Sequence, residues 1–200
     1  MYRYVGEERI PVSWAEIAEA NGRTAHRQMQ FPSLIGYSYY KQQSSPADIW
    51  DERTNEGHLP KRLAQSLGQS LRKHTATPES CWFAVWEGFG SFGIYEPTIV
   101  AAPSFEIPGR QLHLFSAPVD AAEDSFCDIE DYQSANLWWP DDKAWCVATE
   151  IDFMTTYVGG SLAAIEDILA CKDLETYRAE PSDGVQRASD TVNPKPEGGW

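Results

Sequence analysis

The sequence predicts an α+β fold: a mainly antiparallel sheet with N-terminal helices and one late helix packed on it. Three observations support this fold class. Helical signals occur at residues 13–22 and 60–74, strand patterns follow within residues 81–153, and a helical pattern returns at residues 161–170. Because helices and strands are segregated along the chain, this order favours α+β over regularly wound βαβ units.

The first helix is predicted to begin at Ser13. The segment from Ser13 to Glu16 has the pattern of a capping box, in which the Ser hydroxyl accepts a hydrogen bond from the Glu amide. The Glu side chain in turn accepts one from the Ser amide. Asn21 and Gly22 are a common end signal, so this helix is expected to be short.

The strongest helical pattern spans residues 60–74. Pro60 suits a first helical turn, and basic residues gather in the last turn, where they interact favourably with the helix dipole. Leucines recur every four residues at Leu59, Leu63, Leu67 and Leu71. This stripe is expected to pack on a core. The preceding residues, 31–57, support no assignment.

Four segments are predicted to be strands. Residues 81–86 are continuously apolar, which is typical of a strand buried on both faces. Residues 97–102 and 110–115 are further candidates, and residues 145–153 have the clearest alternation. That alternation places Trp145, Val147, Thr149 and Ile151 on one face and Cys146, Ala148, Glu150 and Asp152 on the other.

A late helix is predicted at residues 161–170, with Ser161 as its N-cap. Its apolar stripe consists of Leu162, Ile165, Ile168 and Leu169. Residues 174–179 are expected to add an edge strand. We therefore predict a single globular domain at residues 1–179. Residues 180–200 are rich in Pro, Gly and charge, which predicts a weakly ordered C-terminal tail.

Acidic residues are unevenly distributed along the 200-residue chain, whose net charge is −14. Residues 1–80 have a net charge of +1 and residues 81–200 a net charge of −15. Residues 120–152 alone contain ten Asp or Glu against the single Lys143. Nucleic acid is not expected as a partner, because binding it needs basic side chains. A basic protein or a metal ion fits the charge, and so does acidity that only keeps the protein soluble.

Membrane insertion and export are not expected. The chain contains no run of 18 apolar residues, and its start lacks the basic and then apolar order of a signal peptide. The sequence therefore predicts a cytoplasmic location.

Cysteine and histidine spacing indicates no zinc site and no cofactor. The four Cys form no C-x-x-C pair, and the four His form no metal-binding pattern. The cysteines are expected to be structural thiols rather than a disulfide framework. His113 lies on a predicted strand, where it is either an ordinary outward residue or a base beside a carboxylate.

Three segments resemble a group of uncharacterised proteins common in actinobacteria. They are residues 75–90 (TATPESCWFAVWEGFG), 136–153 (NLWWPDDKAWCVATEIDF) and 156–161 (TYVGGS). The resemblance covers roughly residues 60–180, and it implies no activity. The predicted arrangement is also similar in class to bacterial immunity proteins, which are often small, acidic and α+β.

Glu150 and Asp152 are the first candidates for a functional site. Their spacing would place both carboxylates on one face of a strand, about 7 Å apart along the backbone. Such a pair suits general acid and base chemistry, because repulsion raises one pKa. With Asp141 and Asp142 on the preceding turn, the same carboxylates could hold Mg²⁺ or Ca²⁺. The alternatives are a solvated strand face, or pairing with Arg110 across the sheet.

Trp138 and Trp139 are candidates for a recognition surface. Adjacent residues in a strand or turn point in opposite directions, so one of the two indoles is expected to be exposed beside Asp141 and Asp142. Exposed Trp residues are enriched at interface hot spots. Burial of both indoles is the alternative.

Two functions fit these patterns. The first is a non-enzymatic protein-binding module of immunity or interaction type, which docks a basic protein through residues 120–152. The second is an enzyme or metal-dependent site built on Glu150, Asp152 and Asp141, with His113 as an optional member, that acts on a small polar or cationic substrate. A homo-oligomer that buries its aromatic surfaces remains possible.

Overall fold

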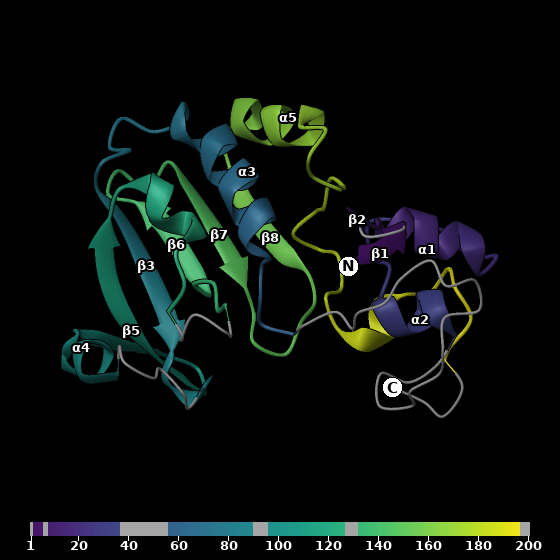
Figure 1. The fold of residues 1–200 in the computed structure, drawn as a ribbon, viewed down its shortest axis with the longest axis horizontal. Helices are drawn as coiled ribbons and strands as arrows, with labels where there is room; N and C mark the ends of the chain where they lie inside the picture. The colour runs from purple at the N-terminus through teal and green to yellow at the C-terminus, as the bar shows by residue number, and fades with distance from the viewer. Residues whose placement is uncertain (1, 6–7, 37–55, 90–95, 127–131, 197–200) are drawn as a thin grey trace. The chain divides into compact units, whose positions relative to one another are not determined.

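The computed structural model describes residues 2–5, 8–36, 56–89, 96–126 and 132–196. The chain divides into two compact units (Figure 1). The central unit contains Asn55–Leu174, and the terminal unit combines Met1–Thr54 with Glu175–Trp200. Each unit is described by itself below.

The central unit is built on an antiparallel six-stranded sheet. Its elements are α3 (Lys61–Arg72), β3 (Cys81–Trp86), the 3₁₀ helix η1 (Glu87–Phe89), α4 (Glu96–Ala101), β4 (Ser104–Ile107), β5 (Arg110–Ala117), the 3₁₀ helix η3 (Val119–Glu123), β6 (Leu137–Pro140), β7 (Trp145–Thr149), β8 (Thr156–Gly160) and α5 (Leu162–Ala170). The strand order is β4-β5-β3-β6-β7-β8, and every neighbouring pair is antiparallel. The predicted α+β class is confirmed.

One face of this sheet carries the main core, under α3, α5 and η3. Register places Phe83 opposite Trp138 and Trp138 opposite Val147, so these side chains share one face. The Trp138 ring stacks on Phe83 with centroids 6.0 Å apart and meets Trp145 edge-on at 5.3 Å. The helices add buried side chains to this layer, namely Ala64, Leu67, Leu71, Val119, Ala122, Ala164 and Ile168.

The opposite face of the sheet carries an aromatic contact that spans several strands. Phe105 on β4 and Trp139 on β6 are separated in the sheet by β5 and β3, yet their ring centroids lie 6.3 Å apart. Ala84 and Leu112, on the strands between them, are 0% and 2% exposed. Trp139 is only half-buried, so this face has an aromatic layer whose outer side meets solvent.

The predicted central helix and strand are both confirmed. Helix α3 occupies the stretch predicted at residues 60–74, and Ala64, Leu67, Gly68 and Leu71 form its buried side. Strand β3 matches the prediction for residues 81–86. Phe83 and Val85 are buried on one face of the sheet and Ala84 on the other, so a continuously apolar sequence is stable there.

The strand predicted at residues 97–102 is wrong, because the chain forms α4 there. Of the side chains described in this helix, Ile99 alone is buried, against Val85, whereas Val100 is 64% exposed. Pro97 lies in the first helical turn, which favours a helix. The strand preference of Ile and Val depends on packing against neighbouring strands, which this segment lacks in the described structure.

Strand β7 ends at Thr149, four residues before the predicted end at residue 153. A turn follows, in which the Phe153 amide donates to the Glu150 carbonyl at 3.1 Å. The Phe153 carbonyl accepts from the amide of Gly57 at 2.9 Å. Gly57 has φ +68°, and a Cβ there would come within 2.9 Å of the Ile151 backbone. This long-range turn contact ends the strand.

Helix α5 begins after Ser161, whose hydroxyl accepts from the Ala164 amide, as predicted. Its apolar stripe is rotated relative to the prediction. Ala164 and Ile168 are buried, whereas Leu162 is 58% and Leu169 38% exposed. The helix therefore contacts the core mainly through Ala164 and Ile168.

The terminal unit contains β1 (Tyr2–Val5), β2 (Glu8–Pro11), α1 (Trp14–Ala20), α2 (Phe31–Ile35) and η4 (Arg187–Ser189). The capping box at Ser13 is confirmed in both of its hydrogen bonds. The edge strand predicted at residues 174–179 is absent. The Glu175 carboxylate instead accepts from the Trp14 and Ala15 amides at 2.6 and 2.7 Å, which satisfies the start of α1.

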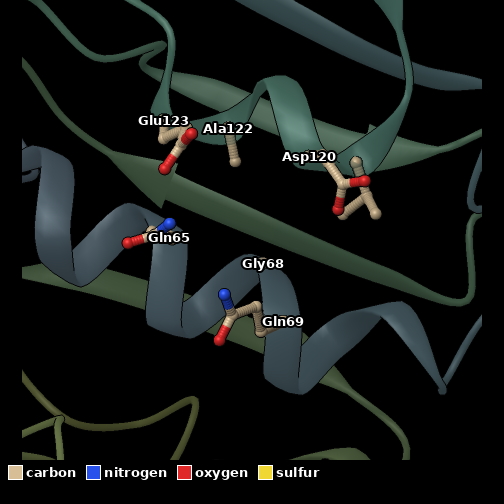
Figure 2. A pocket seen from close by; sticks show the side chains of 7 residues that line it. Gln65, Gly68, Gln69, Asp120, Ala122 and Glu123 are labelled. Atoms are coloured by element: carbon tan, nitrogen blue, oxygen red, sulfur yellow. The ribbon is translucent and has the colours of Figure 1, made fainter.

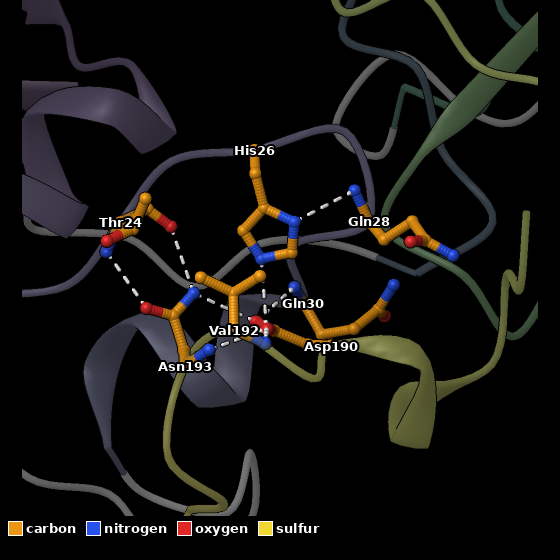
Figure 3. A network of polar contacts seen from close by, with 7 residues as sticks. All are labelled: Thr24, His26, Gln28, Gln30, Asp190, Val192 and Asn193. Atoms are coloured by element: carbon orange, nitrogen blue, oxygen red, sulfur yellow. Dashed lines mark hydrogen bonds and ion pairs between the residues drawn. The ribbon is translucent and has the colours of Figure 1, made fainter.

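The C-terminal segment of the terminal unit is attached by a buried carboxylate (Figure 3). Asp190 accepts from His26 Nε2 at 2.9 Å and from the backbone amides of Gln30, Val192 and Asn193. The Asn193 side chain also donates to it at 3.0 Å. The Asp190 side chain is fully buried. These contacts lie in the stretch for which the sequence predicts a weakly ordered tail.

None of the described helices has the length and apolar character that crossing a bilayer requires.

Candidate functional site

The structure separates the two tryptophans that the sequence proposed as a recognition pair. Trp138 is 2% exposed and belongs to the main core. Trp139 is half-buried on the opposite face and contacts Phe105. The adjacent residues do point in opposite directions, but the outward indole lies in an aromatic layer.

Asp141 and Asp142 both follow β6 and are both exposed, yet they have different roles. Asp141 accepts from the Trp82 indole Nε1 at 3.1 Å. Asp142 accepts from the backbone amides of Ala76 and Ala144 and from the Thr75 hydroxyl, at 2.7, 3.1 and 2.8 Å. Although the slight burial acts in the opposite direction, these hydrogen bonds lower the pKa of Asp142. Asp142 is therefore an acceptor that holds two turns together.

Glu150 and Asp152 lie in the turn after β7 rather than on one face of a strand. Both pair with Arg110, whose Nη2 lies 3.3 Å from Glu150 and 2.8 Å from Asp152. The same guanidinium lies over the Trp86 ring, 5.7 Å from its centroid. The pairing with Arg110 that the sequence allowed is thus the arrangement found. It neutralises much of the charge that a metal ion or a proton-transfer pair would need.

His113 is not the outward residue that the sequence favoured. It lies on β5 opposite Val85 and is 8% exposed. The described residues contain no group of three or more His, Cys, Asp or Glu side chains placed to hold a metal ion.

The central unit has a further acidic feature at η3, which contains Asp120 and Glu123 and is followed by Asp124. Side chains three apart in a 3₁₀ helix are eclipsed, so η3 and the residue after it form three rows. Val119 and Ala122 point into the core and are 0% and 6% exposed. Asp120 and Glu123 form a second row, and Ala121 and Asp124 form the third.

The row of Asp120 and Glu123 borders a recess between η3 and α3, which we call the polar recess (Figure 2). Its volume is about 310 Å³. Gly68, Val119 and Ala122 form its apolar part, and Gln65, Gln69, Asp120 and Glu123 supply its polar groups. A Cβ on Gly68 would lie 3.5 Å from Ala122 and from the Val119 carbonyl, which is an ordinary van der Waals contact, so Gly68 lies at the floor of the recess.

The two carboxylates of the polar recess differ in their partners. Asp120 accepts from Arg72 Nη1 at 2.9 Å, and Glu79 binds the other end of the same guanidinium. Within the described part of the chain, neither Glu123 nor the next residue, Asp124, has a side-chain hydrogen bond or ion pair. Their charge is therefore available to a partner.

The row of Ala121 and Asp124 borders a second recess of about 240 Å³, the apolar recess, on the other flank of η3. Its apolar lining consists of Phe83, Ile99, Phe115, Ala117, Ala121 and Phe126. Thr98, Asp124 and Ser125 add polar atoms. A single 3₁₀ helix thus separates a polar recess from an apolar one.

The electrostatic potential around η3 is negative. Burial, together with the charges of Asp124 and Glu123, raises the pKa of Tyr132. Burial and the nearby Asp142, Glu79 and Asp120 raise the pKa of the Cys81 thiol to about 11, although Arg72 opposes this. The whole central unit contains 18 Asp or Glu against 7 Lys or Arg, a net charge of −11. The field therefore favours cations.

The acidity of residues 120–152 is evident in the sequence, but η3 and its recesses were not predicted. The available signal was a three-residue period in residues 119–124, in which apolar Val119 and Ala122 precede acidic Asp120 and Glu123. Such a short 3₁₀ pattern is weak on its own. The Gln side chains that complete the polar recess come from α3, more than 50 residues earlier in the chain.

Comparisons of the chain with models of protein families, with curated proteins and with solved structures found no match.

Proposed function

We propose that this protein is a non-enzymatic binding module whose central unit docks a basic segment of a protein partner on η3. The observation that carries the proposal is that Glu123 and Asp124 have no side-chain partner among the described residues and lie beside a recess lined by amide and carboxylate groups. A cationic side chain would gain charge-assisted hydrogen bonds there.

The charge of the central unit supports the same proposal. A net charge of −11 attracts a basic partner over several ångströms, which raises the association rate. Nucleic acid does not fit this surface, because its phosphates bind to basic side chains and would be repelled by the acidic ones. A catalytic or metal-dependent site on Glu150 and Asp152 loses its main geometric support, because both carboxylates are bound to Arg110.

The test is affinity capture with the purified protein from lysate of the cells that make it, followed by binding measurements on the purified partner. We expect wild type to bind more weakly as salt rises, because ionic attraction is screened. The variant Glu123→Lys with Asp124→Lys should lose at least about tenfold in affinity, as for other electrostatic interfaces.

The control variant is Glu166→Lys with Asp173→Lys. Both residues are exposed carboxylates on α5 or just after it, so the change in net charge is the same. Equal losses of affinity in both variants would mean that only the overall charge matters, and would reject η3 as the docking site. Binding that ignores both variants and salt would reject the proposal. Asp142 is unsuitable for this test, because its substitution would disrupt two turns.

A further inference from the structure

We infer that the apolar recess receives one large apolar side chain of the same partner, so that the recognised segment carries a Lys or Arg and an apolar residue on opposite sides of η3. This inference rests on the proposed function and specifies the chemistry of the partner. It assigns a separate role to each flank of η3.

The geometry of η3 places the two recesses on adjacent rows of one short helix. Asp120 and Glu123 border the polar recess, whereas Ala121 and Asp124 border the apolar one. Residues one position apart in a 3₁₀ helix lie about 2 Å apart along its axis. One extended segment that crosses η3 can therefore reach both recesses.

The size and lining of the apolar recess suit one large side chain. A cavity of about 150 Å³ lined by aliphatic and aromatic groups holds a benzene ring. The apolar recess has about 240 Å³, and Phe83, Ile99, Phe115 and Phe126 surround it. Leu, Met or Phe would bury most of its apolar surface there, which is favourable.

Charge identifies the occupant as part of a basic partner. Asp124 lines the apolar recess and Glu123 the polar one, so any chain entering either recess meets a carboxylate that no described side chain binds. A second copy of this chain, with its net charge of −14, would be repelled from this surface. A fatty acid would meet the same repulsion at its carboxylate.

The experiment is selection of random heptapeptides displayed on phage against the full-length protein. We expect the enriched peptides to contain at least one Lys or Arg together with Leu, Ile, Met, Phe or Trp. Replacing the apolar residue of a selected synthetic peptide by Ala should weaken its binding about tenfold or more, as expected for losing one buried apolar side chain.

Variants that fill the apolar recess test whether the apolar residue of the peptide binds there. Ala121→Leu extends a side chain into the apolar recess, and Thr98→Trp covers it from an exposed position on α4. Each should weaken the original peptide about tenfold but leave its Ala-substituted form unchanged. The control is Ala163→Leu, at an exposed position on α5. A melting curve for each variant shows whether it is folded.

The outcomes separate the inference from the proposed function. Suppose that the enriched peptides are basic but show no apolar preference, and that Ala121→Leu and Thr98→Trp do not weaken their binding. This result would overturn the inference and leave the proposed function standing. The inference would also be overturned if the apolar residue of the peptide still contributed to binding in both Ala121→Leu and Thr98→Trp. Absence of basic peptides, or binding that Glu123→Lys with Asp124→Lys does not weaken, would reject the proposed function itself.

Discussion

At the scale of single residues, the carboxylates of this chain fall into two groups according to the donors around them. Asp142 and Asp190 accept several hydrogen bonds, most of them from backbone amides, and hold loops in place. Glu150 and Asp152 share Arg110. Within the described residues, Glu123 has no such side-chain partner, and it lines the polar recess.

Asp190→Asn should destabilise the terminal unit. Burial alone would raise the pKa of Asp190, but hydrogen bonds from Asn193, Gln30 and His26 outweigh it and lower the pKa. Neutralising a fully buried acceptor of this kind should cost about 2–3 kcal/mol at pH 7. The measurement is hydrogen exchange of the Gln30, Val192 and Asn193 amides.

The same carboxylate predicts a pH dependence with a defined sign. Because the folded pKa lies below the unfolded value of about 3.9, the stabilisation is complete above that value. It is lost as pH falls through the folded pKa. The difference in exchange between wild type and Asp190→Asn should therefore shrink as pH falls below about 4. A difference that grows as pH falls from 4 to 2 would contradict this account.

At the scale of elements, packing partners decide which side of a helix is buried. Helix α5 has four apolar positions that fit a helical stripe, yet its contact with the core is centred on Ala164 and Ile168. On α3, Gly68 faces η3 and lies close to Val119 and Ala122, which are both buried. The same contact forms the floor of the polar recess.

Two truncations on α5 test its orientation. Ile168→Ala should lower the free energy of unfolding by about 2–4 kcal/mol, because it leaves a cavity in the core. Leu162→Ala, at a side chain that is 58% exposed, should cost less than about 1 kcal/mol. Urea unfolding of both variants measures the difference. Similar losses for the two would mean that the stripe predicted from the sequence faces the core after all.

At the scale of the whole molecule, charge and core are both concentrated in the central unit. The main cluster of buried apolar side chains lies entirely between Leu59 and Ile168, and no member comes from the terminal unit among the described residues. The central unit also accounts for −11 of the total charge of −14. Both properties belong to one compact unit.

A fragment of residues 55–174 should therefore fold without the terminal unit. We expect a single cooperative unfolding transition and well-dispersed NMR amide signals, because the sheet and the helices that cover it are all present. The control is the same fragment with Phe83→Asp, which places a charge in the core. A fragment that resembles this control would show that the core needs the terminal segments.

Local signals in the sequence account for the elements that were predicted correctly. The capping box at Ser13, the N-cap at Ser161 and the leucine spacing of residues 60–74 all depend on residues a few positions apart. The apolar run at residues 81–86 also indicated its burial directly. Such signals act within one turn or one strand, so the sequence determines them almost unaided.

Tertiary structure decided the remaining features, because each depends on residues far apart in the chain. His26 and Asp190 are 164 positions apart, and Arg110 and Asp152 are 42 apart. The polar recess forms only where Gln65 and Gln69 face η3 across the core. The sequence by itself determined the α+β class, the main elements and the acidic charge. Only the folded chain decided which carboxylates are neutralised and which remain available to bind, since that depends on which donors the fold brings within hydrogen-bonding distance.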